Sequence, residues 1–154
     1  MQIEPDHVDE QRLIDMGAEA EHVRVTADKR VVVWRARMTA QRGPIRRVPV
    51  LFVHLCIEGG GHLCQKTGLS DLDTELRPGD LGIAPPNLRG SGHWPEMRVI
   101  SIGIAVDSLV ESFGADWPRK QKKSALTQTV RDPLVEATMM DIGYTRADEV
   151  SDAT

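Results

Sequence analysis

Cysteines, long apolar runs and positive charge are all scarce in this 154-residue sequence. Two cysteines are too few for a small disulfide-stabilised scaffold, and we expect both to be reduced thiols. No apolar run approaches the roughly 20 residues that a membrane-spanning helix needs, so we expect no membrane partner. The formal net charge of -4 argues against nucleic-acid binding by this segment itself. The chain opens on acidic and polar residues without a basic and then apolar leader, which predicts a cytoplasmic protein.

Motifs for nucleophilic and phosphate chemistry are missing as well. No serine lies in a Gly-x-Ser-x-Gly elbow, and Gly59-Gly60-Gly61 is not followed by the Lys-Ser/Thr pair of a phosphate-binding loop. We therefore predict that the chain is not an enzyme. With 40% apolar and 27% charged residues, it should form one globular domain with a substantial core.

Short strand-like segments separated by glycine and proline dominate residues 30–105. The best-defined turn is Arg77-Pro78-Gly79-Asp80, in which proline presets φ and glycine supplies the positive φ of a type II turn. Such segments at this spacing are typical of a β-barrel or sandwich. The predicted strands cover residues 30–37, 49–57, 62–66, 71–76, 81–84 and 97–105, with a glycine-rich loop and short strand over 87–95.

The two ends of the chain have a different composition. Residues 1–29 are polar and acidic, and we interpret them as an N-terminal arm with one weak helical pattern over 9–16. Residues 107–154 have helical patterns, and we expect this segment to serve in dimerisation or as a linker and to continue beyond its last residue. The barrel itself is then expected over residues 30–106.

Two helices are predicted in the C-terminal segment. Asp107 is placed to cap a short helix that Gly114 stops. Asp132-Pro133 combines an N-cap with a proline at the first helical position, and Gly143 is placed to end this second helix. Its apolar stripe, which packs on the barrel or forms a dimer interface with a partner protomer, consists of Val135, Met139 and Ile142.

The tripeptide His-Leu-Cys occurs twice, on the two sides of a turn of three glycines, as His54-Leu55-Cys56 and His62-Leu63-Cys64. If a hairpin pairs even-numbered with even-numbered residues, both histidines and both cysteines lie on one surface. There they could bind zinc or iron, or line a small-molecule pocket. If even residues pair with odd ones, the two motifs face opposite sides of the sheet. We expect no cofactor, and the candidate metal ligands are His54, Cys56, His62 and Cys64.

The segment over 52–105 resembles a cupin, with a strand, a glycine-rich hairpin, a Pro-Gly-Asp turn and a last strand. Residues 79–85 have the Gly-x5-Pro spacing of metal cupins. The tripeptide His54-Leu55-Cys56 stands where that family has His-x-His. His62 lies near the position of the acidic ligand, and His93 lies a few residues past that of the last ligand. The resemblance implies a cupin-like, jelly-roll β-barrel with a degenerate metal pattern.

More specifically, residues 30–145 resemble the N-terminal sensor domain of AraC/XylS-family transcription regulators. The resemblance is carried by Val53 to Gly61, Leu76 to Leu81, Val99 to Ile102, and Asp132-Pro133-Leu134 at a helix start. It implies a barrel that holds a small-molecule effector, helices that pair protomers into a homodimer, and a C-terminal DNA-binding domain that this chain does not contain.

We therefore expect an effector-sensing and dimerisation domain. Trp34 and Phe52 also suit a plain core, whereas His93-Trp94 suits a mobile lid. Two alternatives stay open: a metal-dependent cupin enzyme such as a dioxygenase or isomerase, and an interaction module with a dry barrel. The candidate ligand-binding residues are those expected to point inward or to form the lid, namely Trp34, Phe52, His54, Cys56, His93 and Trp94.

Overall fold

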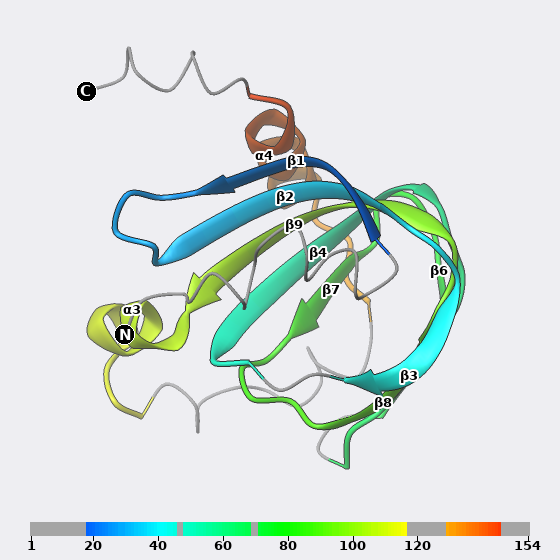
Figure 1. Ribbon diagram of the computed structural model, residues 1–154, viewed down its shortest axis with the longest axis horizontal. Helices are drawn as coiled ribbons and strands as arrows, with labels where there is room; N and C mark the ends of the chain where they lie inside the picture. Colours follow the sequence, from blue (N-terminus) through cyan, green and yellow to red (C-terminus); the bar gives the residue numbers. More distant parts are fainter. Residues whose placement is uncertain (1–17, 46–47, 69–70, 117–128, 146–154) are drawn as a thin grey trace.

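The computed structural model describes residues 18–45, 48–68, 71–116 and 129–145 of the chain. These residues form nine strands and two helices (Figure 1). The strands are β1 (Ala18–Val25), β2 (Val31–Met38), β3 (Gln41–Ile45), β4 (Val50–Gly59), β5 (Gly61–Lys66), β6 (Leu72–Leu76), β7 (Leu81–Ala84), β8 (Gly90–Trp94) and β9 (Met97–Ala105). The helices are α3 (Val106–Phe113) and α4 (Pro133–Tyr144).

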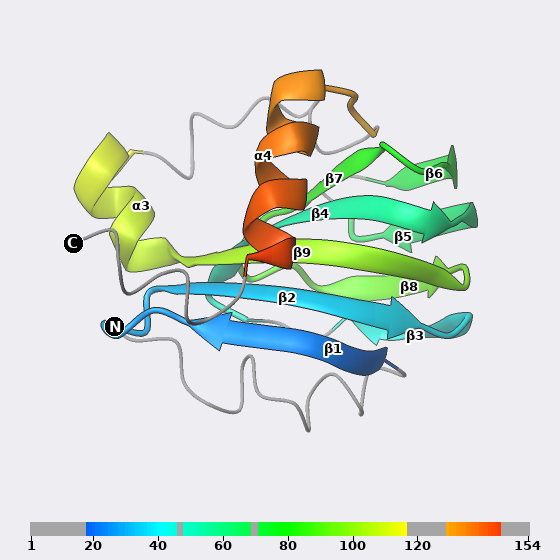
Figure 2. The same cartoon turned by 90° about the horizontal axis from the view of Figure 1, so that it is seen from above.

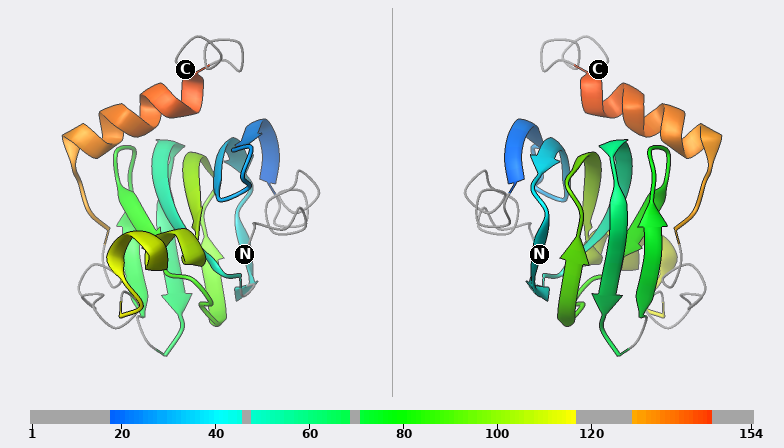
Figure 3. Two further views of the ribbon diagram at one scale, coloured as in Figure 1. Left: turned by 90° about the vertical axis from the view of Figure 1, so that its left-hand side faces the viewer. Right: turned by 90° about the vertical axis from the view of Figure 1, so that its right-hand side faces the viewer.

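The strands form two antiparallel sheets that face each other as a barrel (Figures 1 and 2). One sheet has the order β1-β2-β9-β4-β7 and the other β3-β8-β5-β6. Helix α4 lies across the outer face of the five-stranded sheet, and α3 follows the end of β9 (Figures 2 and 3). The predicted mainly β fold with C-terminal helices is confirmed. Neither helix in the described ranges is long and apolar enough to cross a membrane.

The inward faces of the two sheets supply the apolar core. On β2, Trp34 and Ala36 point inward and are buried, while Arg37 points outward and is exposed, as the alternation of the sequence predicts. The Trp34 ring lies 5.0 Å from the Phe52 ring at an interplanar angle of 41°. Removing these side chains from water stabilises the barrel. A second cluster, between the sheets, contains Cys56, Leu63, Leu72 and Leu76.

Two strands lie where the sequence analysis places none. Residues 18–25, part of the predicted arm, form β1, which pairs with β2 at the edge of the five-stranded sheet. Residues 41–45, for which no strand is predicted, form the edge strand β3, where Pro44 is tolerated. Neither segment has a strong apolar alternation, because an edge strand buries little of its surface. The predicted helix over 9–16 lies outside the described residues.

The predicted hairpin between residues 54 and 64 is wrong, because β4 and β5 belong to different sheets. Strand β4 pairs with β9 and contains a β-bulge: Cys56 lies opposite Val99 and Glu58 opposite Arg98, so Ile57 is an extra residue. The chain then turns toward the other sheet at Gly60, whose φ is 118°. A Cβ atom there would lie 2.3 Å from the carbonyl oxygen of Leu76. Only glycine fits this corner.

The turn over residues 77–80 contacts the segment that precedes α4. The buried Asp80 carboxylate accepts a hydrogen bond from Arg77 N at 2.8 Å and, through its other oxygen, one from Arg131 Nε at 2.8 Å. Arg131 also donates from Nη2 to the Pro78 carbonyl at 2.9 Å. Besides joining two strands, the turn therefore anchors the N-terminal side of α4 to the barrel.

Helix α4 begins as predicted. The Asp132 carboxylate accepts hydrogen bonds from Leu134 N and Val135 N, the geometry of an N-cap. The predicted end at Gly143 is wrong, because the helix continues through Tyr144. A Cβ atom on Gly143 would lie 2.6 Å from Ile100 Cδ1, so this glycine allows close approach of the helix to the sheet.

The N-cap of helix α3 lies two residues before its predicted position. Its N-cap is Ala105, which makes no side-chain capping bond, and Asp107 lies in the first turn. The carboxylate still lies at the positive end of the helix dipole, where negative charge is favourable. The predicted cap at Asp107 is therefore wrong in position.

Candidate functional site

His54 lies on the inward face of β4, between β9 and β7 of the five-stranded sheet. Its neighbours across the ladder are Gly82 on β7 and Ser101 on β9. Its Nδ1 lies 2.6 Å from Ser101 Oγ, and its ring stacks on Phe52 with centroids 5.5 Å apart. The ring nevertheless retains some solvent-accessible surface. His54 is therefore a packed, partly buried histidine on the inner face of the barrel.

Burial sets the charge of His54. Because protein atoms replace the water around the ring, the pKa of His54 is lowered to about 4. The imidazole is therefore neutral at pH 7. Its hydrogen bond to Ser101 is made through Nδ1, and Nε2 has no hydrogen bond to a described residue. A neutral ring with one unused nitrogen can exchange a hydrogen bond with a bound molecule but offers no charge.

Ser101 is a site residue that the sequence analysis misses. It is fully buried and is the polar partner of His54. The available signal is a hydroxyl at an inward position of the strand Met97–Ala105, whose neighbouring inward residues Val99 and Gly103 are not polar. Its pairing with His54 spans 47 residues of sequence, which no local pattern predicts.

Trp94 supplies a second polar group to the interior. It is the last residue of β8 and packs against the cluster of Cys56, Leu63, Leu72 and Leu76. Its indole Nε1 is buried and has no hydrogen-bond partner among the described residues. A buried donor without an acceptor costs free energy, which a ligand with an acceptor could recover.

Cys56 is a poor candidate for a reactive or ligating group. It is 2% exposed, and burial raises the pKa of its thiol, which keeps it protonated. The thiol donates a weak hydrogen bond to the Glu58 carbonyl at 3.7 Å. Cys56 therefore lines the interior as an apolar side chain.

His93 lies on the opposite face of β8 from Trp94. On the outside of the barrel, its Nδ1 lies 3.1 Å from Arg42 Nη2, and its ring lies 5.5 Å from that of His62. The prediction that His93 and Trp94 act together in a loop is wrong, because both lie in a strand whose successive side chains alternate between faces.

The four candidate metal ligands do not meet. His54 and Cys56 point into the barrel from the five-stranded sheet, whereas His62 and Cys64 lie on the outside of the four-stranded sheet. There His62 Nε2 pairs with Asp73 Oδ1 at 2.6 Å, and both side chains are exposed. Within the described residues, no group of three or more His, Cys, Asp or Glu side chains is placed to hold a metal ion. The four-ligand site is therefore wrong.

The predicted dimer stripe packs largely on its own barrel. Met139 is 2% exposed and contacts Leu55, Leu81 and Ile100, so its assignment to a dimer interface is wrong. Ile142 is partly buried, and Val135 borders an apolar groove between α4 and the sheet. This groove has a volume of about 340 Å³ and is lined by Val53, Ile102, Ile104, Leu134, Val135, Thr138 and Met139.

Among known proteins, only solved structures resemble this chain. No protein-family model and no curated protein matches the chain. Solved structures do. The EutQ protein of Clostridium difficile has a TM-score of 0.45 at 13% identity, with 58% of this chain and 69% of that chain covered. The cupin domain of Schizosaccharomyces pombe Cnp3 has a TM-score of 0.48 at 8% identity, with 66% and 74% covered.

A third similar structure is an RmlC-like cupin from Shewanella frigidimarina. Its TM-score is 0.44 at 13% identity, and the match covers 58% of this chain and 77% of that chain. Two of these three proteins are cupins by name. At these scores the likenesses carry no argument about activity, ligand or partner. Function must therefore be argued from the residues of this chain.

Proposed function

We propose that this chain is the effector-sensing and dimerisation domain of an AraC-type, cytoplasmic transcription regulator, and that it binds a small molecule inside the barrel. The observation that carries the proposal is a pair of ring nitrogens on an apolar interior that have no hydrogen-bond partner among the described residues. These are His54 Nε2, on a neutral imidazole oriented by Ser101, and the buried Trp94 Nε1. They can bind a small molecule through hydrogen bonds, while Phe52 offers a ring to pack against.

The donor set favours binding over metal catalysis. A metal-dependent cupin enzyme needs several imidazole or carboxylate ligands around one point. Here Phe52 and Cys56 flank His54 on the same strand face, and the next histidine, His62, lies outside the barrel. We propose that the protein binds its ligand without converting it chemically. We also propose that any contact with DNA is made by a separate C-terminal domain.

Dimerisation is proposed through the outer surface of α4. Leu134 is 76% exposed and borders the apolar groove, and Met140 and Tyr144 add partly exposed apolar surface. Exposed apolar patches of this kind are typical of interaction sites. If a second copy of the chain covers Leu134, then Leu134→Asp should convert a dimer into a monomer. Size-exclusion chromatography with light scattering measures the mass, and the circular dichroism spectrum should be unchanged. An unchanged mass would contradict this interface.

The ligand site is tested by thermal-shift screening of uncharged aromatic and sugar-like small molecules. A compound that raises the melting temperature of the wild type should lose at least about tenfold in affinity with His54→Ala and with Trp94→Phe, because each removes one hydrogen bond. His62→Ala is the matched control, since this histidine belongs to the second His-Leu-Cys tripeptide and lies on the outside of the barrel. Equal losses in the control, or none in His54→Ala, would count against the site.

Metal analysis tests the competing enzyme function. Stoichiometric iron or zinc in the purified protein that disappears in His54→Ala would favour the dioxygenase or isomerase alternative. Metal retained in His54→Ala but lost in His62→Ala would place it on the outer surface instead, and the ligand-sensing proposal would stand.

A further inference from the structure

The C-terminal end of α4 is bound by arginines of the sheet. The last carbonyl groups of a helix lack partners within the helix and carry partial negative charge. Arg24 of β1 donates from Nη2 to the Ile142 carbonyl at 2.8 Å, and Arg35 of β2 donates from Nη1 to the Gly143 carbonyl at 2.6 Å. The last turn of α4 contains no basic residue of its own. The cations that neutralise this helix end therefore come from β1 and β2.

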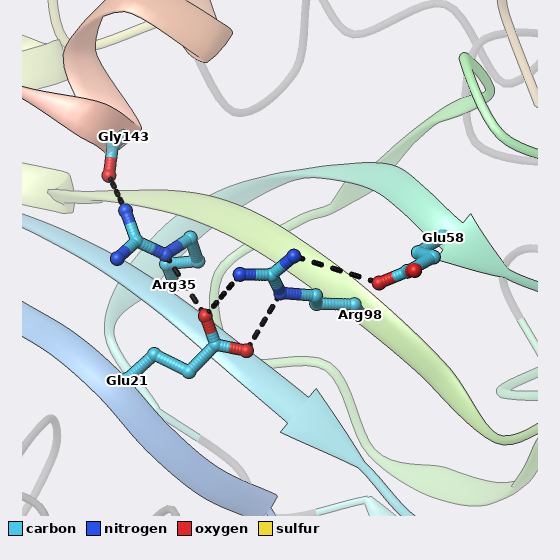
Figure 4. A network of polar contacts seen from close by, with 5 residues as sticks. All are labelled: Glu21, Arg35, Glu58, Arg98 and Gly143. Atoms are coloured by element: carbon cyan, nitrogen blue, oxygen red, sulfur yellow. Dashed lines mark hydrogen bonds and ion pairs between the residues drawn. The ribbon is translucent and has the colours of Figure 1, made fainter.

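Glu21 sets the position of the arginine that binds Gly143. A β-bulge between Ala20 and His22 makes Glu21 an extra residue in β1. Its carboxylate accepts a hydrogen bond from Arg35 Nε at 3.0 Å and two from Arg98, from Nε at 2.7 Å and Nη2 at 2.6 Å (Figure 4). Arg35 thus bonds Glu21 on one side and α4 on the other. The two guanidinium groups also lower the pKa of Glu21, Arg98 most, so the carboxylate stays charged.

Tyr144 completes the contact. Its ring lies 4.2 Å from Arg35 Cζ in a cation–π arrangement. On the far side, Arg98 Nη1 also reaches Glu58 of β4 at 3.5 Å (Figure 4). We name Glu21, Arg24, Arg35 and Arg98 the Glu21 network. It links strands β1, β2 and β9 to the last residues of α4.

The docked arrangement is incompletely satisfied. Arg24 Nε, within this network, and His22 Nε2, on the same strand, are buried and have no hydrogen-bond partner among the described residues. Buried polar atoms without partners cost free energy, which release of the helix end would recover. The hydrogen bonds to the Ile142 and Gly143 carbonyls favour the position of α4 on the sheet, and the unpaired nitrogens of His22 and Arg24 oppose it. This balance is what a two-state element requires.

We propose that the Glu21 network is a conformational control element: it holds the C-terminal end of α4 on the five-stranded sheet, and its loss releases that end while the barrel stays folded. Glu21 is its positioning residue. The importance of this release for signalling rests on the proposed function, because there α4 also presents the dimer surface. The network itself does not depend on a ligand.

The chain has a single tyrosine, which makes Tyr144 a site-specific reporter. Incorporation of 3-fluorotyrosine gives one ¹⁹F resonance at the helix end. With Glu21→Gln we expect this resonance to move toward the solvent-exposed position, and amide exchange over residues 139–145 to accelerate by about tenfold or more. Arg35→Lys should behave alike, because a single ammonium group cannot reproduce the guanidinium contacts with Glu21, Gly143 and the tyrosine ring.

The matched control is Glu111→Gln, which breaks the ion pair between Arg30, just before β2, and Glu111 of α3 and leaves α4 untouched. It should match the wild type in both measurements. Identical behaviour of Glu21→Gln and Glu111→Gln would overturn the proposal, as would loss of protection in β2 and β9 to the same extent as in α4. The ligand screen reports on His54 and Trp94, which are not part of the Glu21 network, so failure of one proposal is distinguishable from failure of the other.

Discussion

The same tripeptide, His-Leu-Cys, occurs in two strands of this barrel with opposite orientations. In β4, His54 and Cys56 point inward, and Leu55 packs outward under α4 against Met139. In β5, Leu63 is the buried residue, while its histidine and cysteine lie on the outer surface. The first histidine is neutral, with a pKa lowered to about 4, whereas the second pairs with an exposed aspartate.

The opposite orientations of the two tripeptides arise from the residues between Cys56 and His62. The extra residue at Ile57 shifts the alternation of β4 by one, so that Glu58 faces outward beside Arg98. The glycine corner that follows then carries the chain into the other sheet. The strand register therefore decides which side chains of the tripeptide point into the barrel and what chemistry they can perform. Four predictions test this comparison.

The largest effect is expected for the two leucines. Leu55→Ala should destabilise the fold by about 2–5 kcal/mol, because the side chain is fully buried between the sheet and α4. Leu63→Ala should cost a similar amount, since this leucine is also buried. Only Leu55→Ala should accelerate amide exchange in α4, including at Tyr144. Urea unfolding with hydrogen exchange measures both, and equal effects on α4 would contradict the opposite orientations.

The glycine corner should be the next most sensitive position. Gly60→Ala should cost about 2–3 kcal/mol, because the residue has positive φ and its new Cβ would meet a backbone carbonyl. Gly68→Ala is the matched control. It also has positive φ but nothing within 4 Å, so only the smaller conformational strain is expected. Thermal unfolding compares the two, and an equal loss would show that the corner is not specific.

The pH dependence of stability separates the two histidines. In the unfolded chain His54 has an ordinary pKa near 6.5, so between pH 6.5 and 4 the unfolded state binds more protons and the fold is destabilised. At pH 5 the loss should be about 2 kcal/mol relative to pH 7.5. His54→Gln should remove this dependence, and His62→Gln should retain it. Urea unfolding across this range is the measurement, and an unchanged slope in His54→Gln would refute the assignment.

The smallest effect is expected on the outer surface. Asp73→Asn removes the carboxylate that His62 contacts, but both side chains are largely exposed to water. The stability should change by no more than about 0.5 kcal/mol at pH 7. A loss comparable to that of the leucine variants would mean that the outer tripeptide is buried in an assembly.

Local chemistry in the sequence predicts the elements well where it is strong. The strand over 81–84, bounded by the Pro-Gly-Asp turn and two prolines, and the apolar strand over 97–105 have the predicted bounds. The N-cap at Asp132 also has its predicted form. Edge strands β1 and β3 escape prediction, because little of their surface is buried and their sequences need not be apolar. The role in transcription regulation stays a prediction from resemblance.

The sequence by itself therefore determines the fold class, most strand positions and the inward alternation of β2 and β4, because these depend on side-chain period and turn chemistry within a few residues. The tertiary structure alone decides which of the candidate residues meet. His54 finds Ser101 47 residues away, and Glu21 finds Arg98 77 residues away. Such contacts depend on strand order and on single-residue bulges, and the side-chain period of two makes one extra residue sufficient to reverse a face.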